Sequence, residues 1–158
     1  MKRFHCASLV LSLLALLVLV FPAAAAGPQP VALSGSGSGT VVMTGSFTFS
    51  GTIVANSLGV VSFSGNSHVT GVDKKNPAIS LVDGAITFFA SNGDQLKATI
   101  TGSSNAGVFS GTLTWDPQNS TGQFAGAKGK GDAISVAVDT SMTTFNILSL
   151  TVDGKFRP

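Results

Sequence analysis

Apolar and polar residues alternate with a period of two along much of the chain from Thr40 onwards. In the first run, Phe47, Phe49 and Ile53 fall on one side, with Gly51 in step, while serines and threonines occupy the other side. An alternation of this kind is typical of a β-strand that buries one face. It therefore predicts a strand whose aromatic side faces the core.

The same alternation recurs up to the C-terminus, with turn residues between the runs. The further sets expected on inward faces are Val61 and Phe63; Leu96, Ala98 and Ile100; Phe109, Leu113 and Trp115; Ile134, Val136 and Val138; and Leu148, Leu150 and Val152. No connection is long enough for a crossover helix, so the sheet is predicted to be antiparallel. A sheet of about eight strands hides its edges by closing. The predicted fold class is all-β, a closed antiparallel barrel, with a β-sandwich as the alternative.

Two segments carry specific turn signals. Asn92-Gly93 lies between the apolar residues 85–90 and the next alternating run, and this pair favours a hairpin because both residues accept positive φ. Asp94 is interpreted as bracing that turn. Residues 73–77 are predicted to form a charged turn, since Pro77 lacks a backbone donor.

Residues 1–26 are typical of a secretory signal peptide. Lys2 and Arg3 precede an apolar run over residues 10–21, and Pro22 precedes four alanines that form a small-residue cleavage site. The run is shorter than the roughly 20 residues of a spanning helix, which favours a cleaved signal over an uncleaved anchor. We expect a secreted or periplasmic protein with no membrane span after signal cleavage.

Residues 27–39 contain a Gly/Ser alternation from Ser34 to Gly39. Such a sequence has no side chains to bury and is typical of flexible coil. The predicted organisation is a signal peptide over residues 1–26, a short flexible Gly/Ser linker over 27–39 and an antiparallel β-barrel domain over 40–158.

Cleavage of the signal changes the composition. Cutting after Ala26 removes 26 of the 158 residues and leaves 132, and the basic residues fall from 9 to 7, which equals the 7 acids. Cys6 is the single cysteine and leaves with the signal, and the chain has no Glu and no Tyr. We therefore expect no disulfide, no thiol nucleophile, no metal site, no cofactor and no nucleic-acid partner. An outer-membrane barrel is disfavoured, because its aromatic girdles need Tyr and Trp.

One segment resembles a known family. Residues 119–129 read Asn-Ser-Thr-Gly-Gln-Phe-Ala-Gly-Ala-Lys-Gly, which is similar to the G-G-T-G-x-F-x-G-A-x-G stretch of allene oxide cyclase-like and dirigent-like barrels in plants and secreted bacterial proteins. The Asn92-Gly93-Asp94 hairpin resembles an element of the bacterial branch, and the similarity extends over residues 40–156. The resemblance implies an eight-stranded antiparallel barrel and, as in the plant proteins, a homo-trimer.

The chain departs from this family at positions that matter for activity. Asn-Ser replaces a glycine pair, Gln123 stands where Arg is common, and Arg157 is the only arginine left after cleavage. The plant cyclases are thought to use a buried glutamate, which this chain lacks. The resemblance therefore implies the fold and not the activity. Within the motif, Phe124 and Ala127 are interpreted as filling one end of the barrel.

No residues stand out as catalytic or ligand-binding, so both sets remain unassigned. His68 is interpreted as a surface residue, and Asp83 lies too close to a turn to suggest one of a pair of catalytic carboxylates. Phe109 and Trp115 share a face and are interpreted as core, with cavity lining as the alternative. Asn119 begins an Asn-Ser-Thr glycosylation acceptor, which is relevant only in a eukaryotic secretory route.

The expected function is that of a secreted, non-catalytic barrel that binds a small apolar ligand or serves as a structural module. The alternative is an allene oxide cyclase-like isomerase that acts on an apolar substrate by conformational confinement. The alternative requires a roomy closed cavity with at least one buried Asp or Asn. Ligand binding requires only an interior that side chains do not fill.

Overall fold

The computed structural model describes residues 27–43, 45–140 and 143–157. The predicted signal peptide over residues 1–26 lies outside the described residues. In the described ranges, no helix has the length and apolar character needed to cross a bilayer.

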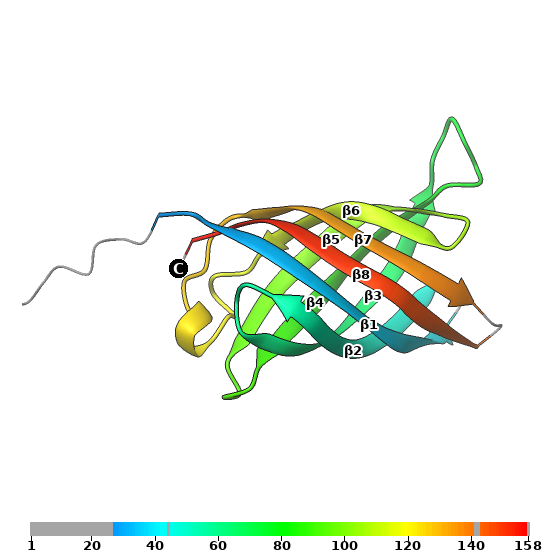
Figure 1. Ribbon diagram of the computed structural model, residues 1–158. Coiled ribbons are helices and arrows are strands. Elements are labelled where there is room, and N and C mark those ends of the chain that lie inside the picture. Colours follow the sequence, from blue (N-terminus) through cyan, green and yellow to red (C-terminus); the bar gives the residue numbers. More distant parts are fainter. Residues whose placement is uncertain (1–26, 44, 141–142, 158) are drawn as a thin grey trace, which may run out of the picture.

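Eight antiparallel strands form a closed barrel in which each strand pairs with its neighbours in the sequence and β1 pairs with β8 (Figure 1). The strands are β1 (Gln29–Met43), β2 (Ser46–Asn56), β3 (Val60–Val72), β4 (Ser80–Ala90), β5 (Gln95–Asn105), β6 (Val108–Trp115), β7 (Lys130–Thr140) and β8 (Thr144–Phe156). A short 3₁₀ helix, η2 (Gly122–Phe124), lies in the β6–β7 connection. The predicted all-β closed antiparallel barrel is confirmed.

The expectation of a flexible linker over residues 27–39 is wrong, because Gln29–Met43 forms β1. This strand pairs with β2 on one side and with β8 on the other. Ser36 and Ser38 are exposed, and the glycines that alternate with them face the interior. A Cβ added at Gly39 would lie 2.1 Å from Cζ of Phe145. The Ser-Gly alternation is therefore a strand pattern whose inward positions carry no side chain.

Inward glycines also face phenylalanine rings elsewhere in the barrel. A Cβ added at Gly51 would lie 2.6 Å from Cζ of Phe63, and one added at Gly65 would lie 2.5 Å from Cζ of Phe49. Each glycine is the direct cross-strand partner of the phenylalanine that covers it. The absence of a Cβ therefore lets the ring lie flat over the neighbouring strand, which fills the narrow interior without side-chain clashes.

Two β-bulges reverse the predicted facing of two residues. Val61 and Leu148 are 47% and 64% exposed, whereas their neighbours Val60 and Ile147 are buried. The register of β3 against β4 shifts at Val61, and the registers of β8 against β1 and β7 shift beside Leu148. An extra residue on one strand turns the side chains around it to the opposite face. The predicted inward positions of Val61 and Leu148 are wrong, and the other inward sets are confirmed.

The predicted β4–β5 hairpin is confirmed, with a three-residue loop. The N–H of Gly93 donates to the carbonyl of Ala90 at 3.0 Å, and the N–H of Ala90 donates to the carbonyl of Asp94 at 2.9 Å. Gly93 has φ of 91° and Asn92 does not have positive φ. This is a tight turn followed by a left-handed residue, a common hairpin form in which only the last loop position requires glycine.

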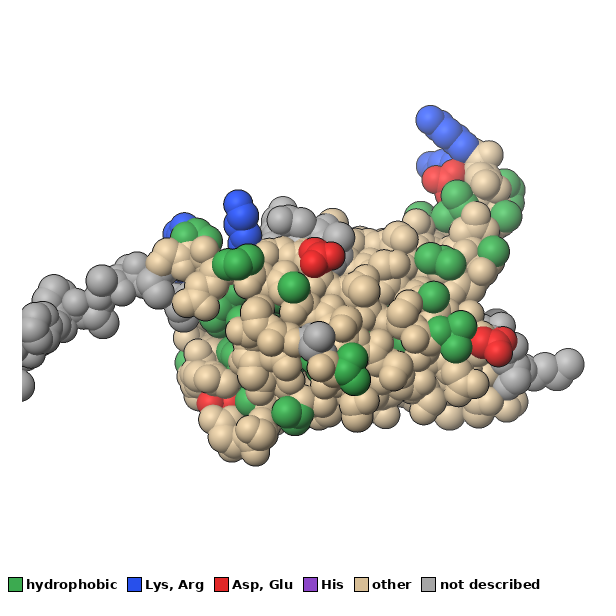
Figure 2. Space-filling model, in the orientation of Figure 1, with side chains coloured by type: hydrophobic (Ala, Val, Ile, Leu, Met, Phe, Trp, Pro, Cys, Tyr) green, Lys and Arg blue, Asp and Glu red, His purple; other side chains and the backbone are tan. Residues whose placement is uncertain are grey.

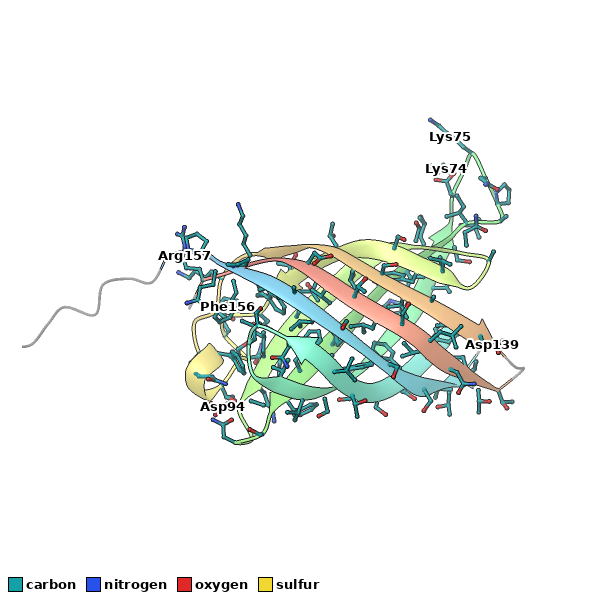
Figure 3. All side chains as sticks on the ribbon, in the orientation of Figure 1. Lys74, Lys75, Asp94, Asp139, Phe156 and Arg157 are labelled. Atoms are coloured by element: carbon teal, nitrogen blue, oxygen red, sulfur yellow. The ribbon has the colours of Figure 1, made fainter. Side chains whose placement is uncertain are left out.

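The core fills one end of the barrel with aromatic rings. Edge-to-face contacts join Phe88 to Trp115, Trp115 to Phe156, and Phe156 to Phe124, with ring centroids 6.0–6.5 Å apart. This end holds the β2–β3 and β4–β5 turns, η2 and the C-terminal end of β8, and is named the capped end (Figures 1 and 3). The opposite end holds the β1–β2, β3–β4, β5–β6 and β7–β8 turns, and is named the open end.

Candidate functional site: an apolar cavity at the open end

The β6–β7 connection closes the capped end by continuing the hydrogen bonding of β5. β6 pairs with β5 only as far as Ala98. The backbone N–H groups of Gln95 and Lys97, which point from β5 toward the side of β6, therefore have no strand partner. The N–H of Gln95 donates to Oγ1 of Thr121 at 3.0 Å, and the N–H of Lys97 donates to Oγ of Ser120 at 3.0 Å. The connection therefore supplies hydrogen-bond acceptors for the backbone of β5 beyond the end of β6.

Asp94 holds η2 against the β4–β5 turn. Its Oδ2 accepts hydrogen bonds from Nδ2 of Asn92 at 2.9 Å and from the backbone N–H of Gln123 at 3.0 Å. This places Phe124 and Ala127, both almost fully buried, inside the end of the barrel. The interpretation of Asp94 as a brace for the turn is confirmed, and so is the predicted placement of Phe124 and Ala127 inside one end of the barrel.

Asp116 organises the start of the same connection. Its Oδ2 accepts a hydrogen bond from Nδ2 of Asn119 at 2.7 Å, and its Oδ1 accepts from the backbone N–H groups of Gln118 and Asn119. These bonds, the one from the Asn119 side chain foremost, hold the pKa of Asp116 below its ordinary value, and the nearby Lys97 acts in the same direction. The carboxylate therefore has a structural role at the capped end.

A cavity of about 260 Å³ lies inside the barrel at the open end. Among the described residues, β2 to β8 and the β5–β6 turn form its wall. The lining residues are Phe47, Phe49, Ser67, Val69, Ser80, Val82, Ile100, Ser104, Gly107, Phe109, Ile134, Val136, Val138, Phe145, Ile147 and Leu150.

Small inward residues leave this space unfilled. Two inward positions in the middle of β1 are the glycines Gly37 and Gly39, and the inward positions of β3, β4 and β5 include serines that line the cavity. At the capped end the corresponding space holds Phe63, Phe88 and Trp115, which are buried. The inward glycines and serines therefore help to leave space between the larger side chains of the open end.

The wall of the cavity is apolar and carries no charge. Four phenylalanines line it, and the rings of Phe47 and Phe145 meet edge to face with centroids 6.1 Å apart. The only polar side chains of the lining set are those of Ser67, Ser80 and Ser104. The cavity can therefore accept an apolar molecule by the hydrophobic effect.

The β3–β4 loop projects from the barrel beside this opening. Oδ1 of Asp73 accepts hydrogen bonds from the N–H groups of Lys75 and Asn76, at 2.7 and 2.9 Å, which confirms the predicted charged turn. Lys74 and Lys75 lie at the tip of this loop, well away from the barrel wall (Figures 2 and 3). Their charges therefore do not enter the cavity.

His68 lies on the outer surface, as predicted. The fold places Ser46, His68 and Asp83 next to one another on β2, β3 and β4, since each is the register partner of the next. Among the described residues, no hydrogen bond joins these three side chains, and none of the three lines the open-end cavity. This row lacks the geometry of a catalytic triad, which needs hydrogen-bonded partners and a substrate cleft.

The remaining predicted candidates fall at the two ends of the barrel. Phe109 lines the cavity, whereas Trp115 is buried in the core, where its Nε1 donates to the carbonyl of Lys155 at 3.3 Å. The predicted core position is therefore confirmed for Trp115, and the alternative of cavity lining holds for Phe109. Asn119 is exposed, and within the described residues no group of three His, Cys, Asp or Glu side chains is placed to hold a metal ion.

Sequence reasoning missed the serines of the cavity wall. Ser80 and Ser104 occupy inward positions, although nothing in their local sequence separates them from the many outward serines. Facing depends on the strand register, which only the folded barrel defines. The inward direction of Phe47 and Phe49 could be predicted, but the space beside them could not, because it depends on residues of distant strands.

No known protein family matches the chain in a comparison with family models, and a sequence comparison finds no matching curated protein. The assignment that the structure supports is therefore the fold, an eight-stranded antiparallel closed β-barrel.

Proposed function

We propose that this protein is a non-catalytic binding barrel that holds one small apolar molecule in the open-end cavity. The observation that carries the proposal is the cavity of about 260 Å³, lined by phenylalanine, valine, isoleucine and leucine side chains. Binding sites for small molecules are typically concave and mostly apolar, with a few polar groups that fix orientation. The filled capped end provides a floor for such a molecule, and the open end provides an entrance.

The cavity supports binding over cyclisation. Ser120, at the capped end, is the buried polar residue among the described residues, and no Asp or Asn lines the cavity. An intramolecular cyclase that acts by confinement needs an enclosed cavity and a polar group to steer the reacting atoms. Here the cavity is open at one end and its polar groups are three serines.

We also propose membership of the allene oxide cyclase-like and dirigent-like barrels, export, and assembly as a homo-trimer. The eight-stranded barrel and the position of residues 119–129 at its end support the family proposal. The signal-like sequence of residues 1–26 supports export. The mass of the exported protein tests cleavage, since its N-terminus is expected at Gly27. Light scattering of that protein tests the trimer.

Binding can be measured by calorimetric titration of the mature protein with neutral apolar compounds of increasing size. We expect saturable binding of one molecule per barrel for compounds that fit the cavity. Val138→Trp, which places an indole in the mouth, is expected to abolish binding. Leu148→Trp is the matched control, because Leu148 lies on the outer face. The proposal fails if no compound binds saturably, or if both variants reduce binding equally.

A further inference from the structure

Three adjacent strands each contribute one serine to the open-end cavity, and phenylalanine rings flank these serines, because Phe47 is the direct partner of Ser67 and Phe109 that of Ser104. Ser67, Ser80 and Ser104 come from β3, β4 and β5, which are adjacent strands. β8 lies halfway around the closed barrel from β4, so Phe145 faces the cavity from the side opposite Ser80. A bound molecule therefore meets both hydroxyl groups and aromatic rings.

Two of these serines are placed to share one polar atom of a ligand. Ser80 and Ser104 are direct partners in the β4–β5 register. The Cβ atoms of such a pair lie about 4.5–5.5 Å apart. A serine hydroxyl both donates and accepts, and in the described part of the chain neither hydroxyl bonds to another protein group. A single ligand oxygen between them can accept from one hydroxyl and donate to the other.

The charge of the ligand is limited by the same wall. No Lys, Arg, His or Asp belongs to the lining set. Lys74 and Lys75 lie at the tip of the projecting loop, and Asp139 lies on the outside of the open end (Figure 3). A carboxylate or ammonium group inside the cavity would lose its hydration without gaining an opposite charge, which is strongly unfavourable. The wall therefore selects a neutral molecule.

The size of the ligand follows from the volume. A dry cavity of about 150 Å³ holds one benzene molecule. In proportion, the cavity of about 260 Å³ holds a molecule of about ten non-hydrogen atoms, the size of two fused six-membered rings. Longer chains would extend out of the open end into water.

From the shape, polarity and volume together we infer that the ligand is a neutral molecule of about ten non-hydrogen atoms, with an apolar body and one hydroxyl or carbonyl group that bonds to Ser80 and Ser104. This inference rests on the proposed function, since it specifies the ligand of the same cavity. The apolar body packs against Phe145 and the valines of β7, and the polar group sets its orientation.

Three related probes test this inference in the mature protein by calorimetric titration: 2-naphthol, naphthalene and 2-naphthoate. They share one ring system and differ in the polar group. Each is titrated into the wild type, into Ser80→Ala/Ser104→Ala, and into Ser50→Ala/Ser110→Ala. The last variant removes two hydroxyls from the exposed outer face and is the matched control. Circular dichroism verifies that each variant is folded.

We expect 2-naphthol and naphthalene to bind to the wild type, and 2-naphthoate to bind at least about 100-fold more weakly than 2-naphthol. Ser80→Ala/Ser104→Ala removes both hydroxyls and is expected to weaken the binding of 2-naphthol by about five- to 100-fold, the value of two net hydrogen bonds, and to leave the binding of naphthalene unchanged. The control variant is expected to leave both unchanged.

The possible failures are distinguishable. If none of the probes binds, both the proposed function and this inference fail. If the two neutral probes bind but the inner-face variant affects them equally or not at all, the serines do not orient a ligand, and only this inference fails. Binding of 2-naphthoate as tight as that of 2-naphthol would likewise overturn the neutral ligand class while leaving ligand binding intact.

Discussion

Removing the ring of Phe124 tests whether η2 seals the capped end. The side chain is 2% exposed and its ring meets that of Phe156 edge to face at 6.0 Å. Truncation of a fully buried phenylalanine to alanine costs about 3–5 kcal/mol, because transfer energy is lost and a cavity remains. We therefore expect Phe124→Ala to lower the free energy of unfolding by that amount.

Phe47→Ala is the matched control, since Phe47 also makes an edge-to-face contact, with Phe145 at 6.1 Å. Its ring is only half-buried and borders the existing cavity. Loss of part of the burial energy of a phenylalanine and of one aromatic pair amounts to about 1–3 kcal/mol, without a new closed cavity. The same deletion is therefore expected to cost less at the open end than at the capped end.

Urea denaturation monitored by fluorescence measures both variants. Trp115 is the single tryptophan of the chain and lies in the capped-end aromatic cluster. Equal slopes of the transitions for wild type and variants would establish that the midpoints report stability. A loss below about 1 kcal/mol for Phe124→Ala, or a loss no larger than that of Phe47→Ala, would refute the claim that η2 is part of the core.

Three further predictions concern backbone and charge. Gly65→Ala is expected to lower the free energy of unfolding by about 1–3 kcal/mol, because the added Cβ overpacks against Phe49. Gly71→Ala has no atom within 4 Å of the added Cβ and is expected to leave the denaturation midpoint nearly unchanged. Ala106→Asn is expected to stabilise by about 0.5–1 kcal/mol, because Ala106 has φ of 46° and asparagine tolerates this region better. The pKa of Asp116 is lowered in the folded protein, so its ionised carboxylate stabilises the protein at neutral pH. This contribution is lost as the pH falls below about 4. Asp116→Asn is therefore expected to make the free energy of unfolding less dependent on pH in the acid range.

The strand pattern could be predicted from the sequence because barrel strands bury one face only. The period-two runs identified most inward residues, and Asn92-Gly93 located a hairpin. Sequence reasoning missed β1 because glycines occupy the inward positions in the middle of the strand, so the usual apolar signal is missing there while the alternation itself persists. The outward direction of the Val61 and Leu148 side chains could not be predicted, because a bulge shifts the register by one residue and the local sequence does not show it.

The candidate site was less accessible to sequence reasoning than the fold. A cavity is defined by the side chains that are missing, and the missing volume lies between strands that are distant in sequence. Phe109 and Trp115 have the same inward pattern, yet one borders empty space and the other is packed among rings. Their difference depends on the height of each residue along the barrel, which follows from strand tilt and stagger.

The pairing of β1 with β8 has a consequence for how the chain folds. Leu33 pairs with Val152 and Gln29 with Phe156, so the closing seam joins the two ends of the described chain. Contacts of such long sequence separation form late and slow the folding of β-proteins. Until the C-terminal strand arrives, β1 and β7 are open edges that can pair with another molecule. During vectorial synthesis, the barrel therefore passes through a stage that is exposed to aggregation. A circular permutant that joins the present ends and opens at the β3–β4 loop would move the closing seam to the β3–β4 pair.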